Sequence, residues 1–471
     1  MSRKTFPLSL LVLFFMAPGI SGQVVRLSLA DATSRALQKN TAILNSQLDI
    51  KISKKKVWET IAQGLPHVDA KSAYQHLFSV PTISLPGTRL SDTYIPVDPS
   101  TGAGTISQLQ LSTGEYIYLN NVIGPAIPLG VKDNISADIT VSQLVFNGSF
   151  FVGLMATKVY SELTLHNVEK TRLDVLETVA NTYRMLQMAE ESRKILTRNL
   201  ENTNKTLSEI SEMNKQGFLE KTDVDQLEIA ANNVRNALNR IDSNLDMGYR
   251  LLKIQLGIED SVRVELGDEM ETGESLTSWG MRLLSEQFNI EQNVDYKLVL
   301  SSEKAARIDL RLAQSRFFPT INAFYNHNEQ LNSAAFNPVP KDVVGVNVSL
   351  PIFSSGERLA IASQKRLALR QAENTRELVA NSLLMQAREY QSDVRLKMEK
   401  YLNQKKNKEL SELIYQRTLE KYRQGLASSM DLMNSQNQFL TSLTDYYQSI
   451  YDLQGSRARL LKMFNISDLN R

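Results

Sequence analysis

Apolar residues recur at helical spacing along much of the chain. Two sets lie three and four residues apart: Leu176, Val179, Tyr183 and Leu186, and Leu440, Leu443, Tyr447 and Ile450. Apolar residues at this spacing form one stripe along a helix, which packs against a partner. Ala, Gln, Asn, Arg and Glu dominate between the stripes, as on solvated helix faces. The chain is therefore predicted to be mainly helical.

Four windows alternate instead between apolar and polar residues: 68–74, 135–141, 321–325 and 344–350. In the last window Val344, Val346 and Val348 share one face, with glycine, asparagine and serine on the other. This alternation predicts strands with unlike faces. A strand in a membrane barrel has about ten residues and such faces. A soluble hairpin shows the same pattern, so the alternation leaves both environments open.

Proline placement separates the long helices from a loop. No proline occurs between Pro128 and Pro319, and none follows Pro351. Because proline costs about 3 kcal/mol inside a helix, such gaps favour long helices. Prolines crowd instead between Pro81 and Pro128. Residues 81–134 are therefore predicted to form an extended Pro-rich loop.

The chain contains an internal repeat. Three residues recur 208 positions later: Gly148 as Gly356, Gly217 as Gly425, and Asp223 as Asp431. Pro66 and Pro319, each expected between a helix and a strand, are 253 positions apart, because only the first copy carries the Pro-rich loop. We predict two tandem repeats, 23–256 and 293–471, joined by the segment 257–292. Each contains a helix, a strand pair and a long helical hairpin, with tips near 217 and 425.

The predicted long helices set a physical constraint. The stretch from Gly148 to Gly217, and its copy from Gly356 to Gly425, runs about 68 residues without proline. At about 1.5 Å per residue, each helix would extend on the order of 100 Å. A helix of this length cannot be buried in a compact domain, so it must belong to a coiled coil, a tube or a rod.

The N-terminus carries a targeting signal. Arg3 and Lys4 precede a short apolar run, and Gly19, Ser21 and Gly22 follow it. This layout is typical of a secretory signal peptide, here residues 1–22. The alternative is a buried N-terminal helix. We expect the protein to be exported.

Composition excludes several functions. Without the signal peptide the chain has 51 basic and 51 acidic residues, so no basic excess favours nucleic acid. It has no cysteine, and its four histidines share no ligand spacing, so neither a metal site nor a cofactor is expected. No phosphate-binding glycine loop or nucleophile motif is present. The sequence therefore predicts no enzyme.

Several ordered motifs carry a resemblance to a known family. They are Leu27-Ser28-Leu29-Ala30-Asp31-Ala32, Ala36-Leu37-Gln38-Lys39-Asn40, Asn293-Val294-Asp295-Tyr296-Lys297, and Pro351-Ile352-Phe353 before Gly356. Pro66, Pro319 and the two glycine tips complete the set. Together they resemble the TolC-like outer-membrane efflux protein family over essentially the whole mature chain.

The resemblance implies a fold and an assembly. Three protomers would each give four strands to one twelve-stranded barrel in the outer membrane of a Gram-negative bacterium. The barrel would be continuous with a long periplasmic coiled-coil cylinder. Residues 257–292, with a strand-like 262–266, would form an equatorial segment. The expected partners are two further copies of the chain, outer-membrane lipid, a periplasmic adaptor protein and an inner-membrane transporter.

The resemblance also places a pore constriction at the second tip. Its expected gate residues are Asp431, Asn434, Tyr422 and Thr222. Three symmetry-related Asp431 carboxylates would favour cations, although Asn434 stands where the family often has a second aspartate. Ala427 stands where the family has an arginine latch. Alternatively, Asp431 simply begins a helix and Tyr422 is ordinary coiled-coil packing.

The tips also carry the expected docking surface for the adaptor. Gly217 and Gly425 accept the positive φ that ends helices. Phe218, Leu219 and Leu426 beside them would expose apolar surface, which an adaptor would cover.

The sequence thus predicts a passive outer-membrane exit duct of a tripartite efflux or type I secretion system. Small molecules are favoured over proteins as cargo. The alternative from another class is a secreted structural coiled-coil protein that never inserts in a membrane. That alternative explains the helices but not four alternating strands at repeated positions.

Overall fold

The computed structural model describes most of the chain. The described residues are 24–84, 86–90, 93–96, 108–110, 116–118, 120–123, 127–332 and 339–466. The predicted signal peptide 1–22 lies outside them, as does part of the Pro-rich segment 81–134. Within the described residues no helix combines the length and apolarity needed to cross a membrane.

The chain divides into two compact units, which we name by their main content. The helical unit comprises residues 1–54, 159–307 and 367–471, and the sheet unit comprises residues 55–158 and 308–366. The helices of the chain are α1 (Leu29–Lys39), α2 (Thr41–Ala62), α3 (Gly148–Lys215), α4 (Lys221–Leu256), α5 (Glu274–Ser285), α6 (Val294–Ser315), α7 (Glu357–Arg423) and α8 (Ser429–Met463).

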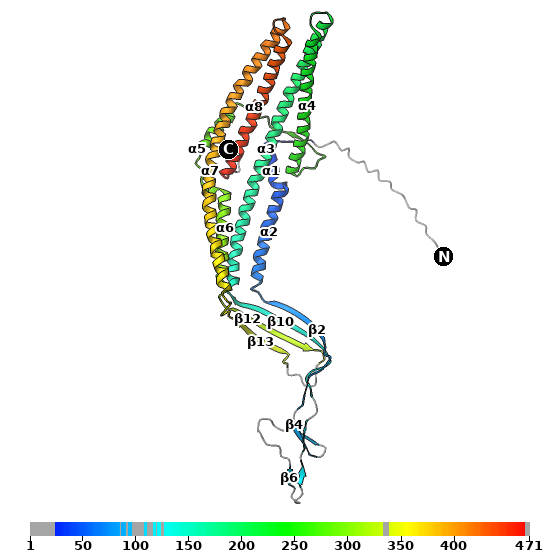
Figure 1. Ribbon diagram of the computed structural model, residues 1–471, viewed down its shortest axis with the longest axis vertical. Helices are drawn as coiled ribbons and strands as arrows, with labels where there is room; N and C mark the ends of the chain where they lie inside the picture. Colours follow the sequence, from blue (N-terminus) through cyan, green and yellow to red (C-terminus); the bar gives the residue numbers. More distant parts are fainter. Residues whose placement is uncertain are drawn as a thin grey trace, which may run out of the picture. The chain divides into compact units, whose positions relative to one another are not determined.

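Two long helical hairpins dominate the helical unit, α3–α4 and α7–α8 (Figure 1). Helices α3 and α7 have 68 and 67 residues, and α4 and α8 have 36 and 35. Equivalent helices therefore agree in length to one residue. The predicted long helices are present, and their positions match the two proline-free stretches.

The predicted apolar stripes form the core of the helical unit. All four stripe residues of α3 are buried, and Tyr183 and Leu186 have no exposed surface. In α8, Leu443 and Ile450 are buried, whereas the other two stripe residues are half-buried. One core cluster joins α3 to α1 and α4, and a second joins α8 to α5 and α7. The helical spacing therefore identified the packed faces correctly.

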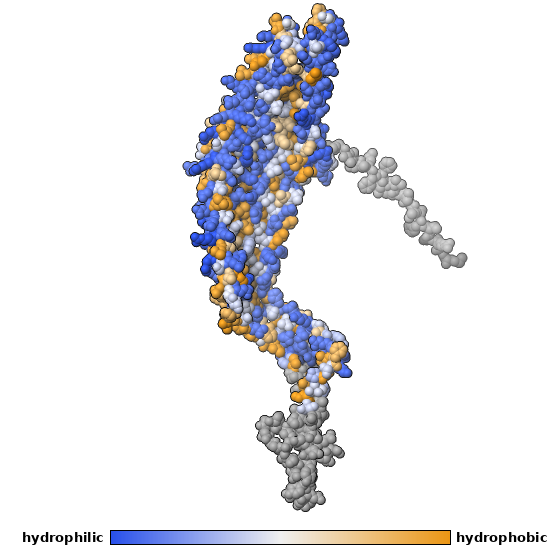
Figure 2. Space-filling model, in the orientation of Figure 1, coloured by the Kyte–Doolittle hydropathy of each residue, from blue (hydrophilic) through white to orange (hydrophobic). Residues whose placement is uncertain are grey.

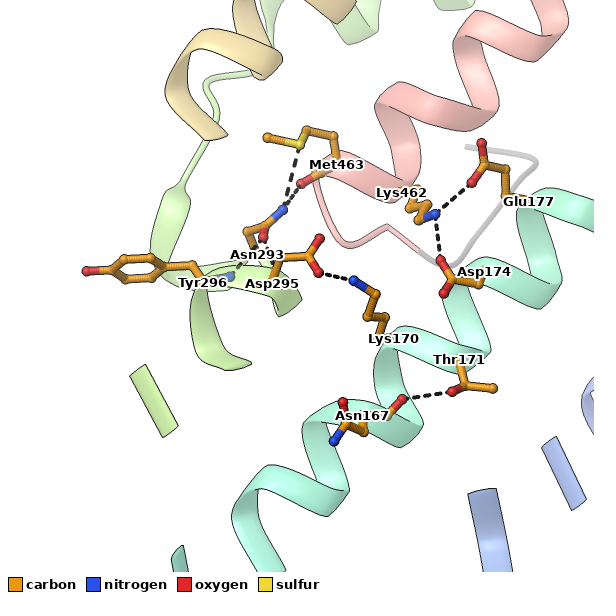
Figure 3. A network of polar contacts seen from close by, with 10 residues as sticks. All are labelled: Asn167, Lys170, Thr171, Asp174, Glu177, Asn293, Asp295, Tyr296, Lys462 and Met463. Carbon is orange, nitrogen blue, oxygen red and sulfur yellow. Dashed lines mark hydrogen bonds and ion pairs between the residues drawn. The ribbon is translucent and has the colours of Figure 1, made fainter. Parts of the chain in front are cut away.

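Two asparagines fix the helices that follow them, and Figure 3 shows one of them, Asn293. The Asn293 side-chain oxygen accepts hydrogen bonds from the backbone N–H groups of Asp295 and Tyr296, at 2.9 and 3.1 Å. Its amide nitrogen donates to the Met463 carbonyl at the end of α8, at 2.9 Å. Asn40 plays a similar part before α2: its side-chain oxygen accepts from the Ala42 N–H at 2.9 Å, and its amide nitrogen donates to the Gln255 carbonyl near the end of α4 at 2.8 Å. These bonds explain why asparagine stands in both sequence motifs.

Salt bridges reinforce the Asn293 junction (Figure 3). Lys170 of α3 pairs with Asp295 at 2.5 Å. Lys462 of α8 pairs with Asp174 at 2.5 Å and with Glu177 at 2.8 Å. The start of α6 and the end of α8 are thereby tied to α3.

The predicted equatorial segment adds a small sheet and a helix. Strand β11 (Arg263–Leu266) pairs in parallel with β1 (Val24–Leu27). The buried Tyr183 hydroxyl donates to the Leu27 carbonyl at 3.0 Å, which ties β1 to α3. A 3-10 helix (Ile290–Gln292) then leads into α6. The strand-like pattern at 262–266 is confirmed as β11.

The sheet unit contains a four-stranded antiparallel sheet. Its strands are β2 (His67–His76), β10 (Asp133–Asn147), β12 (Thr320–Gln330) and β13 (Asp342–Ser349), in the order β13-β12-β10-β2. All four alternating windows are therefore confirmed as strands. Within this sheet β2 and β13 are edge strands.

The register gives the sheet two unlike faces. Val68, Val141, Tyr325 and Val344 are mutual partners across the four strands, so they share one face. On the opposite face Asn326 donates to Thr140 at 2.8 Å. Most exposed apolar residues of the sheet lie on the first face: Val68, Tyr74, Ile139, Tyr325, Val344, Val346 and Val348. We call it the apolar face, and the other the polar face.

The Pro-rich segment corrects the prediction of an extended loop. Its described residues include short antiparallel strands: β3 (Thr82–Ile83), β4 (Pro86–Leu90), β5 (Thr93–Pro96), β6 (Gln108–Gln110), β7 (Tyr116–Tyr118), β8 (Asn120–Ile123) and β9 (Ile127–Pro128). Pro86, Pro96 and Pro128 each stand at the end of a strand. Proline lacks an N–H donor but is tolerated at strand ends, so it does not prevent these pairings.

Candidate functional site at the helix tips

Both hairpins reverse through the same turn. Gly217 and Gly425 have φ of +79° and +73°. The next residue in each case, Phe218 or Leu426, donates its N–H to the carbonyl five residues back, at 3.0 and 2.8 Å. This is the Schellman arrangement that ends helices at a glycine. The predicted role of both glycines as turn residues agrees with this geometry.

Asp431 forms part of a capping box at the start of α8. The Ser428 hydroxyl accepts from the Asp431 N–H at 3.1 Å, and the Asp431 carboxylate accepts from the Ser428 N–H at 3.1 Å. The Ser428 hydroxyl and backbone also lower the pKa of Asp431 below its ordinary value of 3.8. Asp431 and Asn434 are both exposed. The alternative role of Asp431, beginning a helix, is therefore present, and a pore role is compatible with its exposure.

The start of α4 is built differently. Its first flanking residue, Glu220, makes no side-chain cap bond. The Thr222 hydroxyl donates to Glu220 at 3.1 Å, within the same turn. Asp223, the repeat equivalent of Asp431, instead accepts a 2.5 Å hydrogen bond from the buried Ser429 hydroxyl of α8. This bond directly joins the tips of the two hairpins.

Two further contacts support the joint between the hairpins. Gln226 of α4 lies 3.0 Å from the same Ser429 hydroxyl oxygen. Arg423, the last residue of α7, pairs with Glu209 of α3 at 4.0 Å. We call Asp223, Gln226 and Ser429 the tip joint. In the sequence Asp223 stands out only as a repeat position, and no pattern marks Gln226 or Ser429.

Tyr422 packs beside the tip joint. Its ring contacts a buried apolar cluster made of Ile210, Val224, Leu227 and Leu432. Burial and the nearby Asp223 raise the pKa of Tyr422 to about 12. Its hydroxyl is buried and has no hydrogen-bond partner among the described residues. Tyr422 and Thr222 are therefore not bonded to each other, and Tyr422 contributes to the contact between the hairpins by apolar packing.

The predicted docking residues differ in exposure. Phe218 and Leu426 are each 72 % exposed. Leu219 is half-buried against the apolar cluster of Tyr422. Figure 2 shows apolar side chains among hydrophilic ones at the ends of both hairpins. Met213 and Met430 add to the exposed apolar surface near the tips.

The described residues hold no group of three or more His, Cys, Asp or Glu side chains placed to bind a metal ion. The tip site consists of carboxylates, hydroxyls and apolar rings at the ends of long helices. Such an arrangement can hold two helical hairpins together and can present apolar surface to another protein.

Comparisons with known proteins agree with this architecture. Residues 293–465 match the family described as outer membrane efflux protein. Outer membrane protein TolC of Vibrio cholerae is 22 % identical over 269 residues. That match covers 56 % of this chain and 61 % of the relative. The chain is thus matched to somewhat less than two thirds of that protein's length.

Solved structures cover more of the chain. The outer membrane protein VceC of Vibrio cholerae is 15 % identical, with a TM-score of 0.67 over 93 % of this chain and 96 % of its own. The CmeC outer membrane channel of Campylobacter jejuni is 16 % identical, with a TM-score of 0.68 over 93 % and 86 %. The open MtrE outer membrane channel of Neisseria gonorrhoeae is 14 % identical, with a TM-score of 0.64 over 93 % and 88 %.

The fold is therefore that of outer-membrane channels. These matches agree with the predicted resemblance to the TolC-like outer-membrane efflux protein family, and the relative and structural neighbours named above are outer-membrane proteins, as predicted for this chain. The family and these neighbours are channels rather than enzymes.

Proposed function

We propose that three copies of this chain form a passive exit duct of a tripartite efflux or type I secretion system. Each copy contributes four strands to a twelve-stranded barrel and two helical hairpins to a periplasmic cylinder. The two tandem repeats supply equivalent parts of the wall. Cargo crosses from an inner-membrane transporter to the outside, with small molecules favoured over proteins.

The four-stranded sheet is the observation that carries this proposal. Both of its edge strands, β2 and β13, leave backbone groups without partners in the sheet. In lipid every such group must be paired, so an open four-stranded sheet is not viable there. Pairing β13 of one copy with β2 of the next removes all edges when three copies close a ring. The apolar face would then contact lipid, and the polar face would line the duct.

Exposed apolar stripes on two helices support the same assembly. On α4, Met247, Leu251 and Ile254 lie four and three residues apart and are exposed. On α7, Leu378, Met385 and Leu396 are exposed and lie seven and eleven residues apart, which brings them to one side of a helix. Neighbouring copies would bury these stripes in the wall of the cylinder.

The tips would carry the gate and the docking surface. Asp431, Asn434, Tyr422 and Thr222 would form the constriction, and the tip joint would hold it closed. Gly217, Phe218, Leu219, Gly425 and Leu426 would meet the periplasmic adaptor. Opening would follow differential contacts of the adaptor with the closed and open tips.

Solute release from proteoliposomes tests the duct. Purified full-length protein is reconstituted around a small trapped dye, and release is compared with protein-free vesicles. We expect the protein to need detergent for extraction and to sediment as a trimer. We also expect dye release above that of protein-free vesicles. A water-soluble protein that stays out of membranes would instead support the secreted coiled-coil alternative.

A pair of variants tests the trimer interface. Leu396→Glu places a carboxylate on the exposed stripe of α7, whereas Lys405→Glu places one at an exposed position nine residues further on, on the opposite side of the helix. We expect Leu396→Glu to reduce the trimer fraction strongly, because it would bury a charge, and Lys405→Glu to leave the trimer intact. Equal effects of the two variants would contradict the assigned interface.

A further inference from the structure

The two hairpins of the sheet carry the same polar cluster at corresponding ends. Strands β2 and β12 each contain Tyr-x-His, at Tyr74 and His76 and at Tyr325 and His327. Strands β10 and β13 each begin at an aspartate that follows a lysine, Lys132-Asp133 and Lys341-Asp342. His76 pairs with Asp133, and His327 pairs with Asp342, in the strand register.

The hydrogen bonds of the two clusters are also the same. In the first, Asp133 Oδ1 accepts from the Tyr74 hydroxyl at 2.8 Å and lies 2.7 Å from His76 Nδ1. In the second, Asp342 Oδ1 accepts from the Tyr325 hydroxyl at 2.7 Å and lies 2.8 Å from His327 Nδ1. We call these two sets of three residues the rim clusters.

The two strand pairs share identical residues only at the rim clusters and the adjacent lysines. When β2 and β12 are aligned on Tyr-x-His, and β10 and β13 on Lys-Asp, no other strand position is identical. The two hairpins have therefore diverged everywhere except at these four residue types. A requirement of the folded strands in general would not select the same four residues at both strand ends.

The rim clusters lie on the apolar face of the sheet. Successive residues of a strand alternate between faces, so Tyr74 and His76 share the face of Val68. Asp342 likewise shares the face of Val344, Val346 and Val348, which are all exposed. Six residues separate Asp342 from Val348, about 20 Å of strand. The apolar face thus ends in aromatic and charged groups where both strand pairs meet their loops.

The chemistry of the clusters fits the boundary between acyl chains and lipid headgroups. Tyrosine is enriched at that boundary because one end of its ring is apolar and the other is polar. Since the carboxylate oxygen is an acceptor, His Nδ1 carries the proton donated to it, which leaves Nε2 for another partner. In the second cluster His327 Nε2 lies 4.0 Å from Glu329. Lys132 and Lys341 bring ammonium groups to the same strand ends, and Lys341 also pairs with Glu329 at 2.7 Å. Imidazole and ammonium groups are suitable partners for phosphate oxygens.

We propose that the rim clusters are contact sites for the phosphate headgroups of the lipid leaflet into which the looped ends of the sheet extend. This proposal rests on the proposed insertion of the sheet in a membrane. The carboxylate of each cluster orients the imidazole and the tyrosine toward the headgroups. The two strand pairs would therefore lie at the same depth in the membrane.

Spin labels at single cysteines measure that depth, because the chain has no native cysteine. The full chain is reconstituted in vesicles of phosphatidylethanolamine and phosphatidylglycerol. Labels at Tyr74→Cys, Tyr325→Cys, Val346→Cys and Asn347→Cys are compared for access to oxygen, which concentrates among acyl chains, and to a water-soluble nickel chelate. We expect Val346→Cys to favour oxygen and Asn347→Cys, on the polar face, to favour nickel. Labels at both tyrosine positions should show access intermediate between these two, as expected at the level of the lipid headgroups.

The outcomes separate the two proposals. Nickel access at all four positions would overturn the proposed membrane insertion itself. A second outcome would overturn the rim proposal alone. In it the label at Val346→Cys lies among the acyl chains, and the labels at the two tyrosine positions lie either among the acyl chains or in bulk water.

A second measurement tests headgroup recognition with the cysteine-free chain. Thermal dissociation of the trimer is compared between vesicles of phosphatidylcholine alone and vesicles that also contain phosphatidylglycerol. We expect a higher dissociation temperature with the anionic lipid. His76→Gln combined with His327→Gln should reduce this difference by about half or more, and Asn347→Ala should preserve it. An equal lipid dependence in wild type and the double variant would overturn the proposal.

Discussion

The two helical hairpins turn alike but begin their return helices differently. At the second tip, Asp431 is bonded to Ser428 and completes the cap of its own helix. At the first tip, Glu220 makes no side-chain cap bond, and Asp223 accepts from Ser429 of the other hairpin. The same repeated aspartate therefore stabilises one helix locally and joins two hairpins elsewhere. The residue three positions before the aspartate differs between the tips, Glu220 at the first and Ser428 at the second, and so does the partner of the aspartate.

Breaking the tip joint should have the largest effect. Ser429→Ala removes the donor to Asp223, and a hydrogen bond to a charged group contributes about 1.5–3 kcal/mol. A loss of about 2 kcal/mol changes an equilibrium between closed and open tips roughly thirtyfold. We expect a large rise in the open fraction of reconstituted channels. Ser208→Ala, at an exposed serine of α3, is the control and should leave gating unchanged.

The two glycine turns should respond equally, in contrast to the two aspartates. Gly217→Ala and Gly425→Ala each force a side chain into positive φ, which costs about 1–2 kcal/mol. No neighbour lies within 4 Å of either added Cβ, so the cost is in the backbone alone. Gly455→Ala, inside α8, is the control and should not destabilise the protein. Chemical denaturation checks the result, and unequal losses at the two tips would contradict the equivalence of the turns.

Removing the cap should affect only the second hairpin. Ser428→Ala should cost about 1 kcal/mol, as for other N-cap substitutions, whereas Glu220→Ala should cost little because no cap bond is lost. Hydrogen exchange in the first turns of α8 and α4 measures this difference. A comparable loss of protection in both variants would show that the N-termini of α4 and α8 are stabilised in the same way.

The cap should also depend on pH. The bonds from Ser428 lower the pKa of Asp431 in the folded state below 3.8. Its contribution is therefore complete above the unfolded-state pKa and is lost as pH falls through the lower folded-state pKa. Hydrogen exchange at the start of α8 should speed up in this acid range. In the Asp431→Asn variant this change should be absent, and its persistence would contradict the assignment.

Tyr422→Phe should have the smallest effect. The buried hydroxyl has no partner among the described residues, so its removal leaves no donor or acceptor unpaired. We expect a change in unfolding free energy below about 0.5 kcal/mol and unchanged gating. A marked increase in channel opening would show that the hydroxyl bonds to another copy in the closed assembly. Tyr422→Ala, which removes the ring from the apolar cluster, should be clearly destabilising.

The sequence predicted the elements of the fold well, because periodicity and proline placement are local signals. It located the long helices, the four strands and both glycine turns. It could not show that Asp223 and Asp431 play different roles. The role of Asp223 depends on Ser429, which is distant from it in sequence and adjacent in space. For the same reason it could not find the rim clusters, since Tyr74 and Asp133 are separated by the Pro-rich segment. The short strands in that segment have no clear sequence signal, because each has only two to five residues and prolines stand at several of their ends.

Single-channel recording in planar bilayers tests both the duct and the role of the tip joint in keeping it closed. Wild-type protein and Ser429→Ala are compared in the same lipid. We expect discrete conductance steps for both, with wild type mostly closed and the variant open for a much larger fraction of the time. Conductance with equal open fractions in the two proteins would contradict the role of the tip joint. The absence of any conductance from either protein would contradict the duct itself.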